Sequence, residues 1–354
     1  MSKTRLIAFY LPQFYPTPEN DEWWEPGFTE WTNVARAKPL FKNHYQPKIP
    51  RDLGFYDLRV PETREKQAML AREAGIEGFC YWHYWFGNGK RLLSEVFKEV
   101  VETGKPDYPF CLCWANHSWY QKTWDPTKPD KLLIEQTYPG EDDYIAHFNE
   151  MLPAFKDKRY MKASDGRLLF GTFSTLDKDV FSKFSETWNA LAKQHGLEGF
   201  YFFDFTFNEN SSEKSKEIGY DTCVYDGVRF GLMHASVWEK FNKKYLKKPI
   251  IKEYDEYISY CTNYYSLNKE LTPCINPCFD HSPRSGYKGV ILNNSTPKKW
   301  NKLIKEIANL NNSDEGIIFI KAWNEWGEGN YLEPDSKWGK EYILETAKAI
   351  EELK

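Results

Sequence analysis

Short runs rich in β-branched and aromatic residues alternate along the chain with segments that have the periodicity of amphipathic helices. Several of the runs are apolar throughout, which is typical of parallel strands that are covered on both faces. Eight runs are predicted as strands. They cover residues 5–10, 78–84, 110–116, 167–173, 199–204, 222–226, 273–280 and 316–323.

Helices are predicted between these strands. They cover residues 61–74, 91–103, 143–153, 178–195, 297–310 and 336–353. The first has Pro61 at its first position and ends before Gly75, as helices commonly do. The alternation of strands and helices, with no Pro- or Ser-rich linker, predicts one α/β domain over residues 1–354, a (β/α)8 TIM barrel.

A doubly wound open sheet is the alternative, but no Gly-x-Gly-x-x-Gly motif follows a predicted strand. Two connections are longer than ordinary loops: residues 13–59 after the first strand and residues 227–272 after the sixth. In a barrel such βα loops lie on the face that carries the chemistry.

Composition adds an excess of aromatic rings, because the chain has 14 Trp, 23 Tyr and 24 Phe. Many of them build the core, and the remainder suits stacking on sugars. The net charge of −4 argues against a nucleic-acid partner. One basic cluster fits either the solvated face of an insertion or a contact with a phosphate or an anionic lipid. It consists of Lys240, Lys243, Lys244, Lys247 and Lys248.

Seven cysteines lie mostly in apolar runs, and no Cys/His spacing resembles a zinc site. We therefore predict no disulfide framework, no metal and no cofactor. The sequence begins at Met1 and enters a strand without a signal peptide, and no apolar run approaches the ~20 residues that span a bilayer. If Met1 is the natural start, we expect a cytoplasmic protein without a transmembrane segment, for which a peripheral membrane contact remains open.

The most specific chemistry lies in the segment 323–329, Trp-Asn-Glu-Trp-Gly-Glu-Gly, directly after a predicted strand. It places Glu325 and Glu328 three residues apart between two indoles. A carboxylate pair beside aromatic platforms suits the cleavage of a glycosidic bond, where one group protonates the leaving oxygen and the other supports the cationic sugar. The structural alternative is a helix N-terminus with acids that offset its dipole.

Other predicted strands also end in polar and aromatic residues, which together describe one sugar-sized pocket. The first long loop adds acids and indoles, and Trp119 with the nearby Trp124 and Asp125 offers a further platform. We expect Trp31 and Trp114 to bind saccharide. The predicted substrate-binding residues are Tyr10, Gln13, Trp24, Glu30, Trp31, Tyr81, His83, Tyr84, Trp114, Asn116, Trp119, Asp204, Asp226, Asp280, Arg284, Asn324 and Trp326.

These segments resemble the WbsX family over essentially the whole chain. WbsX proteins are described as glycosyltransferases of O-antigen, lipopolysaccharide and other surface polysaccharide clusters, so the resemblance implies polysaccharide biosynthesis. The likeness rests on residues 10–14, 20–24, 27–34, 81–86, 114–116 and 323–334.

The motif at residues 324–329 is also similar to that of glycoside hydrolase family 99, a family of (β/α)8-barrel endo-α-mannosidases and endo-α-mannanases. That family has Asn-Glu-Trp-His-Glu-Gly, and Gly327 stands where it has His. The likeness implies that Glu325 acts as base on the sugar's 2-hydroxyl and that Glu328 acts as acid on the leaving oxygen, with retention of configuration.

Three functions follow as hypotheses. The first is an enzyme that cleaves or transfers a glycosyl unit of an oligosaccharide or glycan-linked substrate by a glycosidase-like mechanism. The second is a glycosyltransferase that uses a nucleotide- or lipid-linked donor. The only Asp-x-Asp, residues 177–179, lies at a predicted helix start, where capping explains it. The third, a carbohydrate-binding protein without activity, leaves Glu325 and Glu328 unexplained.

Overall fold

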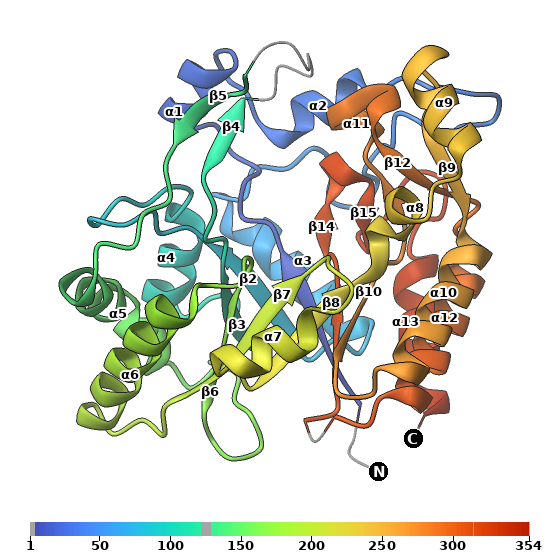
Figure 1. Ribbon diagram of the computed structural model, residues 1–354. Coiled ribbons are helices and arrows are strands. Elements are labelled where there is room, and N and C mark those ends of the chain that lie inside the picture. The colour runs from blue at the N-terminus through green and yellow to red at the C-terminus, as the bar shows by residue number, and fades with distance from the viewer. Residues whose placement is uncertain (1–3, 122–128, 314, 354) are drawn as a thin grey trace. The chain divides into compact units, whose positions relative to one another are not determined.

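The computed structural model describes residues 4–121, 129–313 and 315–353 (Figure 1). Eight parallel strands close into a barrel in the order β1-β13-β10-β8-β7-β6-β3-β2, with helices between successive strands. The predicted (β/α)8 barrel is therefore confirmed. The barrel strands are β1 (Arg5–Tyr10), β2 (Gly78–His83), β3 (Phe110–Trp114), β6 (Leu168–Thr172), β7 (Phe200–Thr206), β8 (Thr222–Asp226), β10 (Thr272–Ile275) and β13 (Ile317–Ile320).

One predicted strand, 273–280, is divided in the structure. The barrel strand β10 ends at Ile275, and a separate strand, β11 (Phe279–Asp280), follows it. β11 belongs to a small sheet of order β11-β12-β9, in which β9 is Ile250–Glu253 and β12 is Val290–Asn293. The remaining short strands form two hairpins, β4 (Trp119–Gln121) with β5 (Lys131–Ile134) and β14 (Asn324–Glu325) with β15 (Asn330–Tyr331).

All six predicted helices are present, with ends that differ by a few residues. They are α3 (Pro61–Glu73), α4 (Glu95–Thr103), α5 (Glu141–Phe155), α6 (Lys178–Gln194), α12 (Pro297–Leu310) and α13 (Glu341–Glu352). The shorter helices are α1 (Pro18–Trp23), α2 (Glu30–Arg36), α8 (Phe230–Met233), α9 (Val237–Tyr245) and α11 (Ser282–Ser285), with 3-10 turns η1 (Gly227–Arg229), η2 (Gly286–Lys288) and η3 (Trp326–Glu328).

The helices α7 (Ser211–Ile218) and α10 (Tyr254–Leu267) were not predicted from the sequence, and neither were the five shorter helices α1, α2, α8, α9 and α11. α10 lies inside the predicted long connection 227–272, so that segment is structured and not a loop throughout. Its buried face consists largely of Tyr254, Tyr257, Ile258, Cys261 and Tyr265. Tyrosine is a weak helix former, and burial of this face against the protein overrides its propensity.

The contacts divide the chain into two compact units. The first unit holds residues 1–15, 29–79 and 224–354, and the second holds residues 16–28 and 80–223. In the first, β1 pairs with β13 in the register Arg5↔Ile317 and Ile7↔Phe319, and both strands are almost entirely buried. In the second, β6 pairs with β7, and Phe170, Phe184 and Trp188 pack into an aromatic core.

All seven cysteines are buried free thiols, as the apolar runs predicted. Within the described residues, no helix has both the length and the apolar character that crossing a bilayer requires.

Candidate active site

Glu325 and Glu328 lie in the first unit, where the chain leaves β13 and passes through β14 into η3. A single arginine, Arg284 of α11, contacts both. Its Nη2 donates to Glu325 Oε1 at 2.6 Å, and its Nη1 donates to Glu328 Oε1 at 2.8 Å. The two carboxyl groups therefore lie within the reach of one guanidinium group.

A third carboxylate joins this cluster from the first long loop. Glu30, at the start of α2, accepts from Arg284 Nε at 3.1 Å and lies 2.9 Å from Arg284 Nη2. Gly327 leaves the room for this contact: a Cβ at residue 327 would meet Glu30 Oε2 and would lie 2.9 Å from Arg284 Nε. The contact between Glu30 and Arg284 therefore requires that residue 327 has no side chain.

Lys321 supplies a second cation. Its Nζ donates to Glu328 Oε2 at 2.7 Å, and the lysine side chain is only 6% exposed. The ring of His281 lies close by, with Nε2 3.9 Å from Glu328 Oε1. Lys321 was not predicted as a site residue from the sequence, although a lysine directly after the buried run of β13 is an unusual placement that could have singled it out.

The pKa values of the two glutamates are shifted in opposite directions. Burial raises the pKa of Glu325 to about 7, and Arg284 opposes the rise. Burial also acts to raise the pKa of Glu328, but the charges of Lys321 and Arg284 outweigh it and lower that pKa well below its ordinary value. In the free protein Glu328 is therefore ionised, and Glu325 titrates near neutral pH.

A hydrogen-bonded layer holds the aromatic residues of the motif. Glu333 Oε2 accepts from Trp326 Nε1 at 2.6 Å and from Tyr56 Oη at 2.8 Å, and its Oε1 accepts from Gln67 Nε2 at 2.6 Å. Tyr10 Oη completes the layer by donating to Gln67 Oε1 at 2.6 Å. Burial raises the pKa of Glu333 to about 7. Tyr10 and Trp326 are thus fixed by this layer.

Asn324 and Trp31 are anchored to backbone groups in the same unit. Asn324 Oδ1 accepts from Leu11 N at 2.8 Å, and its Nδ2 donates to Leu11 O at 3.0 Å. Trp31 Nε1 donates to Tyr56 O at 2.7 Å, and its ring is 8% exposed. Both side chains position the segments around the carboxylates. Gln13 is half-buried after β1.

Asp226, at the end of β8, is buried in a polar chain. Its Oδ1 accepts from Val228 N at 2.9 Å and from Asn276 Nδ2 at 2.6 Å, and Asn276 Oδ1 in turn accepts from Asn330 Nδ2 at 2.5 Å. Burial raises the pKa of Asp226, and the charge of Lys321 opposes the rise. Asn276 was not identified from the sequence, because a single amide between two strands carries no distinctive pattern.

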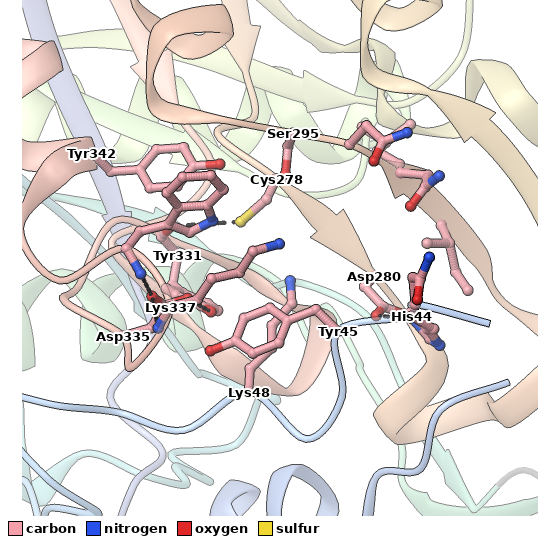
Figure 2. Close-up of a pocket in the computed structure, with 16 residues that line it drawn as sticks. His44, Tyr45, Lys48, Cys278, Asp280, Ser295, Tyr331, Asp335, Lys337 and Tyr342 are labelled. Atoms are coloured by element: carbon pink, nitrogen blue, oxygen red, sulfur yellow. Dashed lines mark hydrogen bonds and ion pairs between the residues drawn. The ribbon is translucent and has the colours of Figure 1, made fainter. Parts of the chain in front are cut away.

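A cavity of about 80 Å³ lies in the first unit, with His44, Asp280 and Tyr331 among its lining residues, and neither Glu325 nor Glu328 lines it (Figure 2). Asp280 lies in its wall, where Oδ2 is 2.8 Å from His44 Nε2 and accepts from Gln46 Nε2 at 2.6 Å. Lys48 Nζ donates to Gly329 O at 2.9 Å. Burial would raise the pKa of Asp280, but His44 and Lys48 lower it to about 2. Asp280 is therefore ionised in the cavity wall, where His44 and Gln46 contact its carboxylate.

The other predicted site residues lie in the second unit. They are Trp24, Tyr81, His83, Tyr84, Trp114, Asn116, Trp119 and Asp204. Trp24 is exposed and stacks on Phe28, and Trp119 is half-buried against Trp23 and Tyr84. Trp124 and Asp125 lie outside the described residues.

The deeper residues of the second unit hydrogen-bond inward. His83 Nε2 is 2.7 Å from His147 Nε2, and burial lowers the pKa of His83 to about 3. Trp114 is 1% exposed and donates from Nε1 to Trp85 O at 2.7 Å. Asn116 clamps the backbone of residue 174 with both ends of its amide. Such contacts are typical of structural side chains.

Asp204 also hydrogen-bonds to side chains of the second unit, and Tyr81 is buried in that unit. Asp204 Oδ2 accepts from Thr175 Oγ1 at 2.7 Å and from Ser215 Oγ at 2.5 Å, and burial raises its pKa. Tyr81 is buried beside Phe97. In the described part of the chain, no group of three or more His, Cys, Asp or Glu side chains has the arrangement of a metal site.

The fold is a (β/α)8 barrel, and its candidate site gathers three carboxylates around one arginine. Residues 6–346 match the model of the family described as glycosyltransferase WbsX, and the chain belongs to that family. It is 32–33% identical to the uncharacterized protein WxcX from two strains of Xanthomonas campestris pv. campestris. The match covers 98% of this chain and 49% of WxcX, so the chain spans about half the length of these curated relatives.

Solved structures share the fold at low sequence identity. A glycoside hydrolase-like protein has a TM-score of 0.63 with 13% identity, covering 99% of this chain and 94% of its own. The GH99 endo-alpha-mannosidase from Bacteroides thetaiotaomicron has a TM-score of 0.58 with 14% identity, covering 98% and 97% of the two chains. The same enzyme in complex with bis-tris propane gives a TM-score of 0.59. At this identity the likeness establishes the barrel fold.

Proposed function

We propose that this protein cleaves or transfers a glycosyl unit of an oligosaccharide or glycan-linked substrate in surface-polysaccharide or O-antigen metabolism, with Glu325 and Glu328 as the reacting pair. The observation that carries the proposal is the joint contact of both carboxyl groups with Arg284. Two carboxyl groups this close, in different electrostatic surroundings, can divide proton donation from charge stabilisation at one glycosidic bond. The structural neighbours named as glycoside hydrolases support the same chemistry.

Arg284 lies where both carboxylates converge, so a sugar that reaches both must move this guanidinium. The resemblance to glycoside hydrolase family 99 gives the base role to Glu325 and the acid role to Glu328. The ion pairs of the free protein favour the exchanged roles, because Lys321 and Arg284 lower the pKa of Glu328 while burial raises that of Glu325 to about 7.

A glycosyltransferase with a nucleotide- or lipid-linked donor is the second candidate, and the family description favours it. Arg284 and Lys321 are cations beside the reacting pair that suit a phosphate leaving group. A carbohydrate-binding protein without activity would not require two neighbouring glutamates whose pKa values are shifted in opposite directions.

The first experiment is incubation of the full chain with a panel of nucleotide-sugars and a panel of lipid-free oligosaccharides. Chromatography then detects nucleoside diphosphate, free sugar and lengthened or shortened saccharides. Shortened or rearranged oligosaccharides support the glycosidase-like reaction, whereas release of nucleoside diphosphate in the presence of an acceptor supports the transferase. A Glu328→Gln variant serves as the control and should lose about 10²-fold or more of the rate.

The roles of the pair are tested on the substrate that the panel identifies. An aryl glycoside of the same sugar needs little protonation of its leaving group. The variant that lacks the proton donor therefore keeps much of its rate on the aryl glycoside, while the variant that lacks the base loses rate on both substrates. The exchanged roles predict that Glu325→Gln is rescued and that Glu328→Gln is not. Equal loss in both variants on both substrates contradicts any division of roles.

A further inference from the structure

Helix α9 has its apolar side facing outward. Val237, Trp238, Phe241, Tyr245 and Leu246, which we call the α9 face, are 85%, 67%, 44%, 60% and 52% exposed. Trp238, Phe241 and Tyr245 recur at the spacing of one helix stripe, and such a stripe ordinarily turns toward the core. The rings of Trp238 and Phe241 stack with centroids 5.5 Å apart, and the rings of Phe241 and Tyr245 meet at a tilt with centroids 4.8 Å apart.

The side of α9 that faces the protein is polar instead. Glu239 Oε1 forms an ion pair with Lys252 Nζ of β9 at 2.7 Å, and no residue of the helix is buried. Glu239 also closes a capping box with Ser236, since each side chain hydrogen-bonds the other's backbone N–H, at 3.1 Å and 2.7 Å. The helix is thus a defined element whose start is fixed while its aromatic side stays uncovered.

Lysines surround the aromatic stripe. Lys240, Lys244, Lys247 and Lys248 are exposed, and Lys243 is half-buried. Two further apolar side chains, Leu232 and Met233 at the end of α8, are also exposed. Interfaces between proteins are depleted of lysine, whereas helices that lie in a membrane surface combine lysines with tryptophan and other large apolar residues. The composition therefore favours lipid over protein as the occupant.

We propose that α8 and α9 dock the protein on an anionic lipid bilayer, with the α9 face inserted at the level of the headgroups and the lysines against the acidic lipids. Trp and Tyr rings prefer this depth because one end of each ring is apolar and the other is wet. Each lysine near such a surface adds to the attraction, which salt weakens.

The docking element is joined to the catalytic cluster within the first unit. Figure 1 shows α9 next to β9, and β9 pairs with β12, which pairs with β11. β11 ends at Asp280, and α11 with Arg284 follows directly. A protein docked through α9 would therefore act on glycans held near the membrane surface. The docking itself does not depend on which reaction the carboxylate pair performs.

The test mixes the full chain with vesicles of phosphatidylcholine alone and of phosphatidylcholine with phosphatidylglycerol, and measures the bound fraction by sedimentation. We expect binding to the acidic vesicles that falls as salt is raised from 0.1 M to 0.5 M. The double variant Trp238→Ser with Phe241→Ser should bind at least 10-fold more weakly. The triple variant Lys240→Gln, Lys244→Gln and Lys248→Gln should lose about 10²-fold.

Matched control variants have the same kinds of change elsewhere in the unit. Met69→Ser with Leu267→Ser removes two apolar side chains that are 57% and 74% exposed, and Lys302→Gln with Lys348→Gln removes two surface charges. Both controls should bind as the unaltered chain does. Absence of binding to acidic vesicles, or an equal loss in the controls, overturns the proposal. So does a dimer that the Trp238→Ser and Phe241→Ser changes convert to a monomer, because a second copy of the chain would then occupy the face.

Discussion

The polar residues that follow the barrel strands have different partners in the two units. In the first unit, Glu325 and Glu328 share Arg284, and Lys321 adds a second cation, so charges of both signs meet at one place. In the second unit, His83 hydrogen-bonds His147, and burial lowers the pKa of both below the ordinary histidine range. One cluster is held by opposite charges and the other by neutral partners. A polar residue after a strand therefore shows only where its side chain lies in the barrel. The charges and hydrogen bonds of its partners decide whether it can take part in catalysis.

The largest expected effect tests whether the second unit uses its indoles for packing. Trp114→Ala should lower the free energy of unfolding by about 3–5 kcal/mol, because a buried ring and its hydrogen bond to Trp85 O are lost. Urea denaturation measures the change, and Trp238→Ala, at an exposed position, is the control. A small loss of stability together with a large loss of saccharide affinity would assign Trp114 to binding.

Next in size is the effect of removing the cation under Glu328. Lys321→Met should cost about 3 kcal/mol at neutral pH, because it leaves the half-buried carboxylate of Glu328 with one cation fewer. Denaturant unfolding of the single variants and of Lys321→Met with Glu328→Gln completes a double-mutant cycle. The double variant should recover part of the loss, since no charge is then stranded. Lys340→Met, which breaks a surface pair with Glu73, should change little.

Asp280→Asn should cost about 2–3 kcal/mol at pH 7, because the native carboxylate has its pKa lowered to about 2 by His44 and Lys48 against the effect of burial. A lowered carboxylate pKa stabilises the fold above its unfolded value near 4, and this contribution disappears as pH falls toward 2. The difference in unfolding free energy between the two proteins should therefore be about half as large at pH 3 as at pH 7. Asp255→Asn, at an exposed ion pair, gives the baseline.

The smallest effect concerns the histidines of the second unit. Burial lowers the pKa of His83 to about 3, so the native protein excludes a proton that the unfolded chain binds below pH 6.5. Stability is complete above pH 6.5 and falls as the pH drops toward 3, by about 2 kcal/mol at pH 5 for this residue. His83→Gln should flatten that part of the pH profile, and His195→Gln, at an exposed position, should leave it unchanged. An unchanged slope in His83→Gln would show that the proton is taken up elsewhere.

The fold could be predicted because its signals are local. Apolar runs and helical periodicity located all eight barrel strands, β1 and β8 have the predicted bounds, and β10 ends five residues before the predicted end. The helices that escaped prediction are the short ones, α1, α2, α7, α8, α9 and α11, and the longer α10, whose tyrosines gain their helical state from burial. Propensity is a weak guide where tertiary contacts supply most of the stability.

The candidate site could be predicted only in part. The motif around Glu325 and Glu328, together with Glu30 and Arg284, was selected from the sequence, and these residues lie in contact. Lys321 and Glu333 were not selected, although both lie within the same stretch of chain. Their importance comes from the partners that face them, Glu328 for one and Trp326 with Tyr56 for the other, and no spacing rule encodes such partners.

The sequence by itself determined the barrel, the free buried cysteines and the segment that carries the carboxylate pair, because each depends on residue type and local periodicity. Tertiary structure alone decided that the pKa of Glu325 is raised and that of Glu328 is lowered, because pKa values depend on burial and on cations that arrive from distant segments. The tertiary structure also decided that the aromatic side of α9 faces outward. The spacing of apolar residues predicts an apolar stripe on the helix, but it does not predict whether that stripe packs on the core or faces solvent.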